Sequence, residues 1–516
     1  MNKHTFIKHL KIILSILILI TSIKSFSQTF KWVKELPFEI LAQTTDKYDN
    51  VYVSGWFTDT IIIEGNLIVN PNYPNSIIIK YDSSGTLLWY KHIKSENENF
   101  CMDIKTDNSN DLILTMSYIP PLVINGDSLF FITGNHNTAI IKLNSDGDIL
   151  WAMTPGYNAN NCFHTYISAI DPNNNFWILG NFYYGIVTFP DTVIDCFGKS
   201  YNYFAKYNKD GNYKWVSFND STSIWYMASD NSGNLILYSQ KYLKASSYAI
   251  TKVSSNGDTL WNIGTLPGVN NYEEFLTIDN NDNIYRFFNF SDTLINYSDT
   301  LVSVGKSDIA LMKYDSAGNF IWNRTAGGPS FDYVRDICSN KDFIFISGSY
   351  SNKIYFQGDS LVGTASYIAG YDTDGNVKFL KRVSGKYSFS LNRMSAYNSL
   401  YITGFAYDSA YFDSLTIVGD CSFLARLSLP QETITVPDYN TPWLFPNPFS
   451  ENVTIVTGIT PETAKIEVYT IQGIRVAEYN TFGTYLTLNL SHLSSGIYLF
   501  RITTDNDRHY IKGLKQ

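Results

Sequence analysis

The sequence of 516 residues is poor in charge and in histidine. Charged residues make up 16% of the chain, against about 25% in an average soluble protein. Acidic residues (47) outnumber basic ones (38), which gives a net charge of −9. A nucleic-acid binder needs a basic surface to displace counterions from phosphates, so this class is excluded. The seven histidines show no HxxxH or HExxH spacing, and no phosphate-binding loop or dinucleotide motif is present, so we expect no metal and no cofactor.

Cysteine is also scarce. Five cysteines are far apart, odd in number and without CxxC spacing, and they are Cys101, Cys162, Cys196, Cys338 and Cys421. This pattern indicates neither a zinc site nor a disulfide framework. We expect buried free thiols, and one or two bridges stay open as an alternative in an oxidising compartment.

Aromatic residues are abundant instead. Tyr (38), Phe (33) and Trp (10) together make up 16% of the chain, while Gly and Pro amount to 48 residues. A disordered chain would be poor in aromatics and rich in net charge. The composition therefore predicts a folded protein, and the short alternating apolar runs described below predict that it is all-β.

The first 27 residues have the pattern of a secretory signal peptide. Lys3, Lys8 and Lys11 precede an apolar run from Ile12 to about Ile23, which is shorter than the ~18 residues that a membrane-spanning helix needs. Small residues at 25 and 27 predict cleavage between Ser27 and Gln28. Removal of residues 1–27 takes away four lysines and no acid, so the mature net charge is −13. No other stretch is apolar enough to cross a bilayer.

One hairpin pattern recurs along the chain. In residues 78–89, apolar residues alternate, a short polar run ends in Gly85, and a second alternating run ends in Trp89. The pattern predicts a β-hairpin whose glycine supplies the left-handed residue of the turn. It recurs at 140–151, 204–215, 250–261, 311–322 and 368–379. The six turn glycines are spaced 62, 64, 46, 61 and 57 residues apart, so the fourth unit is the most divergent.

A polar turn that leads into an apolar strand alternates with these hairpins. It occurs seven times, against six complete hairpins, at 46–57, 107–116, 171–182, 230–238, 279–288, 339–350 and 397–406. Residues 423–427 match the first strand of a hairpin, and residues 29–32 match the second. Placing these two segments side by side completes a seventh unit, closes a ring and removes two exposed sheet edges. Seven units of about four strands predict a seven-bladed β-propeller over residues 28–429.

The hairpins resemble the extracellular bacterial β-propeller repeats with a K-Y-D-x-x-G-x-x-x-W core, over about residues 30–428. This resemblance implies the fold and leaves the activity open. Five tryptophans recur at one register, so we expect them to pack between neighbouring blades rather than to form a sugar-stacking platform. They are Trp89, Trp151, Trp215, Trp261 and Trp322.

Some short segments imitate catalytic or metal-binding motifs. Residues 126–129 and 358–361 carry the letters GDSL found around the nucleophile of one serine-hydrolase family. Other blades carry related tripeptides at the same place and no positioned base is evident, so we expect strand starts. The tripeptides also resemble O-glycosylation acceptors of some Gram-negative bacteria, and that alternative stays open. Residues 279–282 and 372–376 resemble pieces of calcium loops, but they lack the bidentate Glu and are expected to be ordinary turns.

The repeat ends after Pro430. We expect a linker over residues 430–443 and a small Ig-like β-sandwich over 444–516, because alternating runs at 453–456, 464–469, 484–488 and 496–502 are separated by glycine-containing turns. This region resembles the type A C-terminal sorting domain of the type IX secretion system, including its x-Y/F-P-N-P opening; Thr470 stands where that family usually has Asp. The residues singled out for the match are Phe445, Pro446, Asn447, Pro448, Gly473, Gly496 and Tyr498.

The resemblance implies an export route of Gram-negative bacteria. The signal peptide leads to the periplasm, an outer-membrane translocon of the type IX machinery recognises the C-terminal domain, and the cargo is released or attached to the cell surface. We expect a secreted or surface-bound propeller with a binding, adhesion or structural role and a glycan or protein ligand. The alternative is a glycan lyase or hydrolase with its site at the propeller channel, where converging carboxylates or a histidine pair would break the repeat symmetry. The sequence assigns no catalytic residue.

Overall fold

The structure, a computed structural model, describes most of the chain after the first 27 residues. The described ranges are 28–70, 73–95, 97–124, 126–129, 137–155, 157–158, 163–182, 185–195, 201–219, 222–241, 247–264, 274–296, 299–429, 443–445, 449–456, 464–481, 485–504 and 508–515. The expected signal peptide with Ser27, most of the linker, and Pro446, Asn447 and Pro448 lie outside these ranges.

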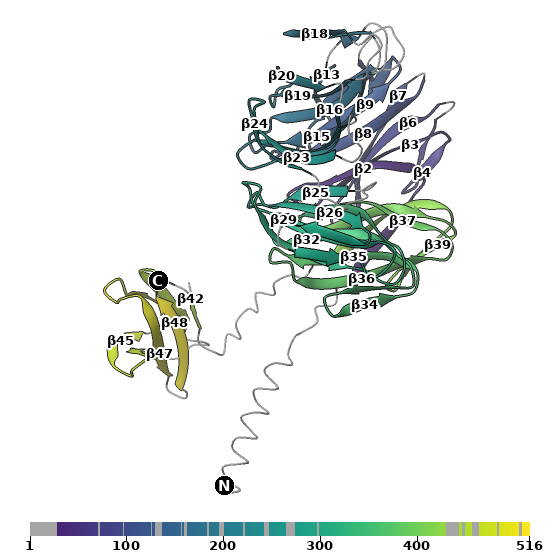
Figure 1. Cartoon of the computed structure of the whole chain (residues 1–516). Coiled ribbons are helices and arrows are strands. Elements are labelled where there is room, and N and C mark those ends of the chain that lie inside the picture. Colours follow the sequence, from purple (N-terminus) through teal and green to yellow (C-terminus); the bar gives the residue numbers. More distant parts are fainter. Residues whose placement is uncertain are drawn as a thin grey trace. The chain divides into compact units, whose positions relative to one another are not determined.

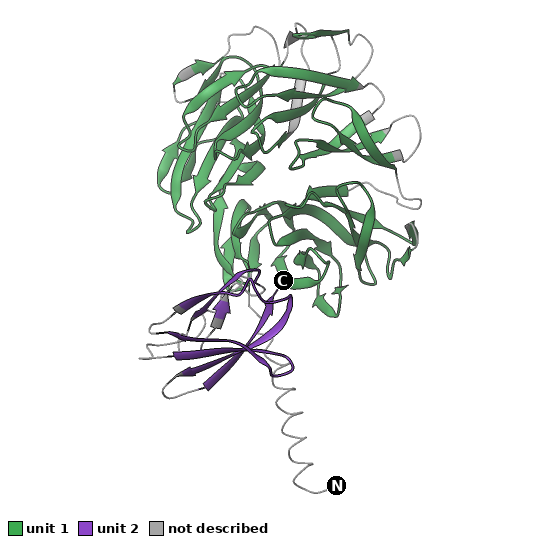
Figure 2. Cartoon of the chain, turned by 90° about the vertical axis from the view of Figure 1, so that its left-hand side faces the viewer, with its two compact units in different colours: residues 1–429 green, residues 430–516 purple. Residues whose placement is uncertain are grey.

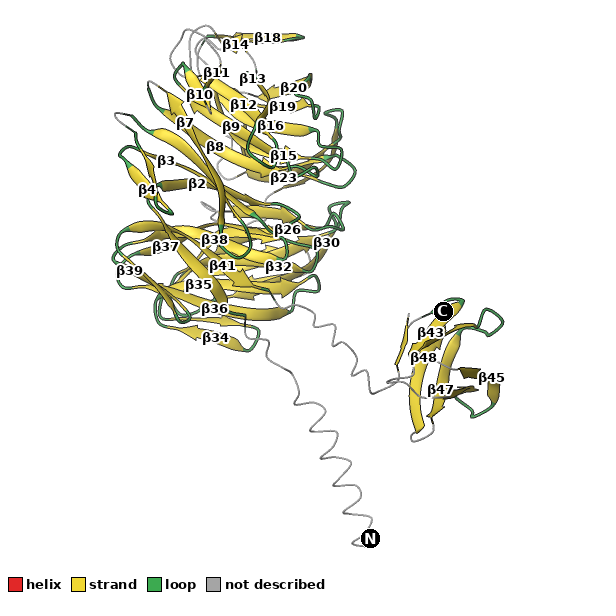
Figure 3. Ribbon diagram, turned by 180° about the vertical axis from the view of Figure 1, so that it is seen from behind, coloured by secondary structure: helices red, strands yellow, loops and turns green. Residues whose placement is uncertain are grey.

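The described residues form strands and no helix (Figure 3), so the expectation of an all-β protein is confirmed. In the described part of the chain no helix is long and apolar enough to cross a membrane. The chain divides into two compact units, residues 1–429 and 430–516 (Figure 2). Each unit is described by itself below.

Groups of four antiparallel strands follow one another through the first unit (Figure 1), and within each group the strands pair in chain order. The first three groups are β2 (Glu39–Thr45), β3 (Val51–Phe57), β6 (Asn75–Tyr81) and β7 (Leu87–Ser95); β8 (Asn99–Thr106), β9 (Leu112–Tyr118), β12 (Asn137–Leu143) and β13 (Ile149–Met153); and β15 (Phe163–Ile170), β16 (Phe176–Phe182), β19 (Tyr201–Tyr207) and β20 (Tyr213–Asn219). The next three are β21 (Thr222–Ser229), β22 (Leu235–Lys241), β23 (Ser247–Val253) and β24 (Thr259–Gly264); β25 (Glu274–Ile278), β26 (Ile284–Phe290), β29 (Asp308–Tyr314) and β30 (Phe320–Ala326); and β31 (Asp332–Ser339), β32 (Phe343–Tyr350), β35 (Ala365–Asp372) and β36 (Val377–Gly385). This succession of small meanders is the architecture of a β-propeller.

The last group joins the two ends of the unit. It consists of β37 (Phe389–Ala396), β38 (Ser399–Ala406), β41 (Cys421–Ser428) and the N-terminal strand β1 (Phe30–Leu36). β1 pairs antiparallel with β41, so that Lys34 faces Leu424. The side-by-side placement predicted for residues 29–32 and 423–427 is confirmed, and the strand runs four residues further than predicted.

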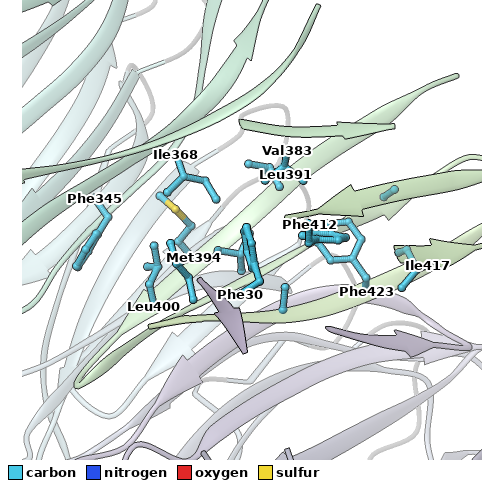
Figure 4. Close-up of a cluster of buried hydrophobic side chains, with 14 of the residues drawn as sticks. Phe30, Phe345, Ile368, Val383, Leu391, Met394, Leu400, Phe412, Ile417 and Phe423 are labelled. Carbon is cyan, nitrogen blue, oxygen red and sulfur yellow. The ribbon is translucent and has the colours of Figure 1, made fainter. Parts of the chain in front are cut away.

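The junction is closed by aromatic side chains. Phe30 from β1 meets Phe412 edge to face at 5.1 Å, and Phe412 meets Phe423 of β41 at 5.0 Å. Figure 4 shows these rings together with Leu400 and Met394 in one buried cluster. The two ends of the first unit, which are far apart in the sequence, therefore share one hydrophobic core.

A short extra hairpin lies between the second and third strands of most groups. The extra strands are β4 (Ile61–Ile63) with β5 (Asn66–Ile68), β10 (Leu122–Ile124) with β11 (Asp127–Leu129), β17 (Ile186–Phe189) with β18 (Thr192–Asp195), β27 (Thr293–Asn296) with β28 (Asp299–Val302), β33 (Lys353–Phe356) with β34 (Asp359–Val362), and β39 (Ser409–Phe412) with β40 (Leu415–Val418), while β14 (Tyr157–Asn158) pairs with β17. Only five residues separate β22 from β23. This short separation accounts for the 46-residue spacing of the fourth unit in the sequence.

Neighbouring groups are joined by a pair formed by one lysine and one tryptophan. Lys80 and Trp89 face each other across the first hairpin. Lys80 Nζ and Trp89 Nε1 both donate to the carbonyl oxygen of Ser145, in the hairpin turn of the next group, at 2.9 and 3.0 Å. The same double donation links Lys206 and Trp215 to Ser255, Lys252 and Trp261 to Ser316, and Lys313 and Trp322 to Thr373.

Among the described residues, two of the six hairpin groups lack this double donation. In the second group, Lys142 Nζ instead donates to Oδ2 of Asp107 in its own group, at 2.7 Å. In the sixth group the reason is topological. Gly370 and Phe379 stand where other groups have lysine and tryptophan. The group that follows them is the closing one, in which β41 and β1 belong to opposite ends of the chain and no hairpin turn connects them. No turn carbonyl is therefore available to accept two hydrogen bonds, and an apolar pair replaces the polar one.

The second unit contains two sheets that share one core. The three-stranded sheet has β42 (Trp443–Phe445), β43 (Asn452–Val456) and β46 (Tyr485–Asn489), and the four-stranded sheet has β45 (Arg475–Thr481), β44 (Ala464–Thr470), β47 (Gly496–Thr504) and β48 (Arg508–Lys515). Val453 and Ile455 from one sheet are buried in the same cluster as Val468 and Phe500 from the other. The unit is a small β-sandwich.

Candidate functional site

The first strands of the groups line a cavity of about 600 Å³ in the first unit. Most of its lining comes from six of them, β2, β8, β21, β25, β31 and β37, and Tyr238 of β22 and Tyr248 of β23 complete it. First strands of propeller blades surround the central channel. The cavity is therefore the central channel. The alternative hypothesis of a glycan lyase or hydrolase expects its active site at this place.

The position of each lining residue follows from the polar turn that ends its strand. Side chains alternate between the two faces of a strand, so residues two and four places before the turn point the same way. Four places before the residue that follows each of these six first strands stand Ala42, Asp103, Tyr226, Phe275, Asp336 and Arg393. All six line the cavity. The positions of the polar turns in the sequence therefore identify the residues that line the channel, although the sequence analysis did not name them.

A β-bulge adds one residue to most of these strands. The ladders skip Leu41, Met102, Trp225, Arg335 and Asn392, in β2, β8, β21, β31 and β37. Bulges re-aim side chains and are common beside binding sites. Trp225 is 56% exposed and lines the cavity together with Tyr226. It belongs to none of the repeated tryptophan positions.

The channel is asymmetric. Aromatic side chains of Trp225, Tyr226 and Phe275 come from the adjacent strands β21 and β25, whereas Asp336 and Arg393 come from β31 and β37. β8 contributes Asp103 and Lys105. One wall is therefore aromatic, and the rest presents charges of both signs.

Asp336 is the most perturbed acid of the channel. Burial raises the pKa of Asp336 to about 6, although Arg393, the N–H groups of Met394 and Ile337, and Lys105 act in the opposite direction. The N–H of Met394 donates to its carboxylate at 2.5 Å. Asp336 also raises the pKa of the neighbouring Cys338, whose burial has the larger effect. The thiol of Cys338 is therefore protonated at neutral pH.

Glu274 lines the cavity, and its carboxylate is held by neighbouring side chains. Its carboxylate accepts hydrogen bonds from Nε and Nη2 of Arg286, the latter at 2.9 Å, and from the hydroxyl of Tyr238 at 2.7 Å. Arg286 is 2% exposed, so this ion pair is buried. Buried charges are stable only when paired in this way.

The expected inter-blade packing of the tryptophans is confirmed where contacts are described. The rings of Trp89, Trp215, Trp261 and Trp322 lie against the turn glycines of the next hairpins, Gly147, Gly257, Gly318 and Gly375, and Trp151 lies against Gly211. All six hairpin glycines have φ between 81° and 98°, the left-handed conformation predicted for them. The lysine of the sequence pattern also has a role: Lys80, Lys206, Lys252 and Lys313 each donate an inter-group hydrogen bond.

The segments that resemble catalytic or calcium-binding motifs lie in the extra hairpins and in turns. Residues 127–129 and 359–361 form or begin β11 and β34, as expected for strand starts. Asp279 accepts hydrogen bonds from the backbone N–H groups of Asn281 and Asn283 and from the hydroxyl of Tyr285. Such local bonds are those of an Asx turn. Among the described residues no group of three His, Cys, Asp or Glu side chains is placed to hold a metal ion.

Three of the five cysteines lie in the described ranges, and Cys101, Cys338 and Cys421 are free thiols. Cys162 and Cys196 lie outside these ranges. Burial raises the pKa of Cys101 to about 12.

The residues singled out for sorting lie in the second unit. Phe445 ends β42, and Gly473, with φ of 83°, makes the turn between β44 and β45. Gly496 begins β47, and Tyr498 is 6% exposed and donates its hydroxyl to the carbonyl of Ser494 at 2.8 Å. These residues fix turns and core contacts of the sandwich. Gln28, the expected first mature residue, is the first described residue.

The chain is similar to some known proteins. The Dos1 propeller is similar over 78% of this chain and 95% of its own, with 9% identity and a TM-score of 0.40. The propeller domain of the Trilobed protease from Pyrococcus furiosus is similar over 80% of this chain and 97% of its own, with 7% identity and a TM-score of 0.33. No curated protein matches the sequence. Residues 443–515 match the family described as secretion system C-terminal sorting domain, and the chain therefore carries a type IX sorting segment behind a β-propeller.

Proposed function

We propose that the chain is an exported seven-bladed propeller of a Gram-negative bacterium that is released or held at the outer membrane. In this proposal residues 1–27 are the signal peptide, 28–429 the propeller, 430–443 a linker and 444–516 an Ig-like sorting domain read by the type IX machinery. The match of residues 443–515 to the sorting family supports the route. The seven groups of four strands and the pairing of β1 with β41 support the blade count.

The role proposed for the propeller is ligand binding at the channel. The observation that carries it is Trp225, a large aromatic side chain 56% exposed on the wall of a 600 Å³ cavity. Sugars and other flat rings pack on exposed tryptophan, and hydroxyl groups pair with charged side chains such as Asp103 and Arg393 on the facing strands. A glycan ligand fits this combination, and a protein loop with an aromatic tip is the other candidate.

Binding of the purified mature chain to a glycan array tests this role. The wild type should retain a defined subset of glycans, and Trp225→Ala should lower that binding at least tenfold. Tyr387→Ala is the matched control, because Tyr387 is 75% exposed and does not line the cavity. Equal binding of wild type and Trp225→Ala would remove the channel from the proposal.

A glycan lyase or hydrolase remains the second candidate, and Asp336 is the observation in its favour. A carboxyl with a pKa of about 6 can donate a proton near neutral pH. Release of reducing ends or unsaturated products from a bound polysaccharide, abolished by Asp336→Asn, would establish it. Binding without product release would favour the binding role.

A further inference from the structure

The basic residues of the second unit are gathered on one sheet. Residues 430–516 contain six lysines and arginines, Lys465, Arg475, Arg501, Arg508, Lys512 and Lys515. All six lie in strands β44, β45, β47 and β48. Of the eight acidic residues in the same range, only Glu467 and Glu478 lie in these strands. These four strands therefore carry a net positive charge, although the mature chain as a whole is acidic.

The strand register orders five of these side chains on the outward face. Ile466, Val468, Phe500 and Ile502 point into the core, so their alternate neighbours point away from it. Three rows cross the sheet in register: Lys465, Thr503 and Arg508; Glu478, Glu467, Arg501 and Tyr510; and Arg475, Tyr469, Leu499 and Lys512. Lys515 is buried and donates to the carbonyl of Ser450.

Glu467 fixes the central cations in place. Its carboxylate, 3% exposed, accepts hydrogen bonds from Nη1 of Arg475 at 3.1 Å, from Nε of Arg501 at 2.6 Å and from the hydroxyl of Tyr469 at 3.1 Å. Although burial opposes ionisation, these bonds hold the pKa of Glu467 at about 2. The two guanidinium groups are thus held in defined positions and are not loose surface charges.

The same face exposes apolar side chains beside the cations. Leu499 is 38% exposed, and Ile497 and Leu514, which face each other across β47 and β48, are each 40% exposed. Tyr510, next to Arg501, is 56% exposed. Contiguous apolar groups within a charged surface are typical of protein interaction sites.

We propose that this basic face, formed by Lys465, Arg475, Arg501, Arg508 and Lys512 with Ile497, Leu499 and Leu514, docks on an acidic and partly apolar protein surface of the secretion machinery. The proposal rests on the export route proposed above and adds the surface of the second unit that the secretion machinery recognises. Complementary fixed charges select and orient a partner. A protein fits better than a membrane, because Glu467 holds the guanidinium groups of Arg475 and Arg501 in fixed positions. Fixed charges select a partner with carboxylates at matching positions, which mobile lipid headgroups do not offer.

Export of the full chain in a bacterium with a type IX system tests the docking face. Arg508→Glu/Lys512→Glu should leave the protein in the periplasm and lower the exported fraction at least tenfold. Lys209→Glu/Lys341→Glu is the matched control, because it makes the same charge change at exposed positions of the first unit. Arg508→Lys/Lys512→Arg keeps the charge and should be exported like the wild type.

A second variant separates docking from folding. Leu499→Ala/Leu514→Ala truncates two exposed side chains, should keep the melting temperature of the wild type and should lower export severalfold. Normal export of both face variants would overturn the docking face and leave the export route intact, whereas retention of the wild type itself would overturn both. Binding of the purified full chain to vesicles of anionic phospholipid, lost in Arg508→Glu/Lys512→Glu, would make the occupant a membrane and overturn the protein partner.

Discussion

Two buried aspartates between neighbouring groups of the propeller should share one proton. Asp308 begins β29 and Asp332 begins β31, and they are 2% and 0% exposed. One oxygen of each carboxylate accepts a backbone N–H, from Val304 and from Gly328, both at 2.7 Å. The other oxygen of each, Oδ1, is buried without a hydrogen-bond partner. A proton on one carboxyl supplies the missing donor.

An asparagine pair elsewhere in the propeller shows the same arrangement with a permanent donor. Asn75 begins β6 and Asn99 begins β8, the positions that correspond to Asp308 and Asp332. Asn99 Nδ2 donates to Asn75 Oδ1 at 2.5 Å. The carboxyl pair can form this bond only while it holds a proton.

The pH dependence follows from the direction of the shift. Burial, with a contribution from Asp308, raises the pKa of Asp332 to about 7, against about 3.9 in an unfolded chain. The folded state therefore binds the proton more tightly than the unfolded state. The stabilisation is full below about pH 4 and is lost as the pH rises through about 7. A shift of about three pH units corresponds to about 4 kcal/mol.

The hydrogen bond from the Gly328 N–H is the interaction that opposes this shift in the pKa of Asp332. The nearby lysines are engaged elsewhere: Lys306 lies over the ring of Phe331, and Lys353 lies over the ring of Tyr355. Burial raises the pKa of Tyr367, so this tyrosine is neutral, and its hydroxyl donates to the carbonyl of Tyr333.

Denaturant unfolding of the mature chain between pH 4 and pH 8 measures the coupling. Asp332→Asn keeps the shape of the side chain and provides a permanent donor, so its stability relative to wild type should rise by roughly 3–4 kcal/mol across this range. Asn99→Asp makes the reverse change in the matched pair and should lose stability relative to wild type as the pH rises. Parallel pH profiles of wild type and Asp332→Asn would refute the shared proton.

Three further predictions concern the propeller. Trp89→Phe removes the indole donor to Ser145 and should lower the free energy of unfolding, measured by denaturation, by about 1–2 kcal/mol. Phe379→Trp has no turn carbonyl to reach and should bring no gain in the same assay. Gly147→Ala should lower the melting temperature more than Gly126→Ala, although both glycines have positive φ. A Cβ at 147 would lie 3.3 Å from Cε2 of the Trp89 ring and would displace the end of Lys91, whereas one at 126 meets nothing within 4 Å. Cys101, fully buried with a raised pKa, should react with a thiol reagent only after unfolding, and rapid reaction in the native protein would contradict its burial.

Those parts of the fold that depend on short sequence patterns, such as turns and alternating strands, could be predicted from the sequence. The hairpins could be found because Gly85 and its equivalents mark turns, and the ring closure followed from an unpaired strand at each end. The extra hairpins were missed because strands of three or four residues such as β4 and β33 are too short to show alternation. The tripeptides at 127–129 and 359–361 were nevertheless correctly interpreted as strand starts.

The site was harder to predict for two physical reasons. A bulge inserts a residue that the ladder skips, so the exposure of Trp225 is invisible in an alternating pattern. The hydrogen bond from Lys80 to Ser145 and the electrostatic effect of Asp308 on Asp332 join residues from neighbouring blades, so both depend on how the sheets meet. Channel residues such as Asp336 and Arg393 could have been found by counting back four positions from each polar turn.

Export of a reporter tests the central claim most directly. A periplasmic reporter protein fused to residues 436–516 and produced with a signal peptide in a bacterium with a type IX system should reach the cell surface or the medium. The same fusion in a strain without a functional translocon should stay in the periplasm. A reporter that remains periplasmic in the competent strain, while a native cargo of that strain is exported, would contradict the assignment of this segment as a sorting domain.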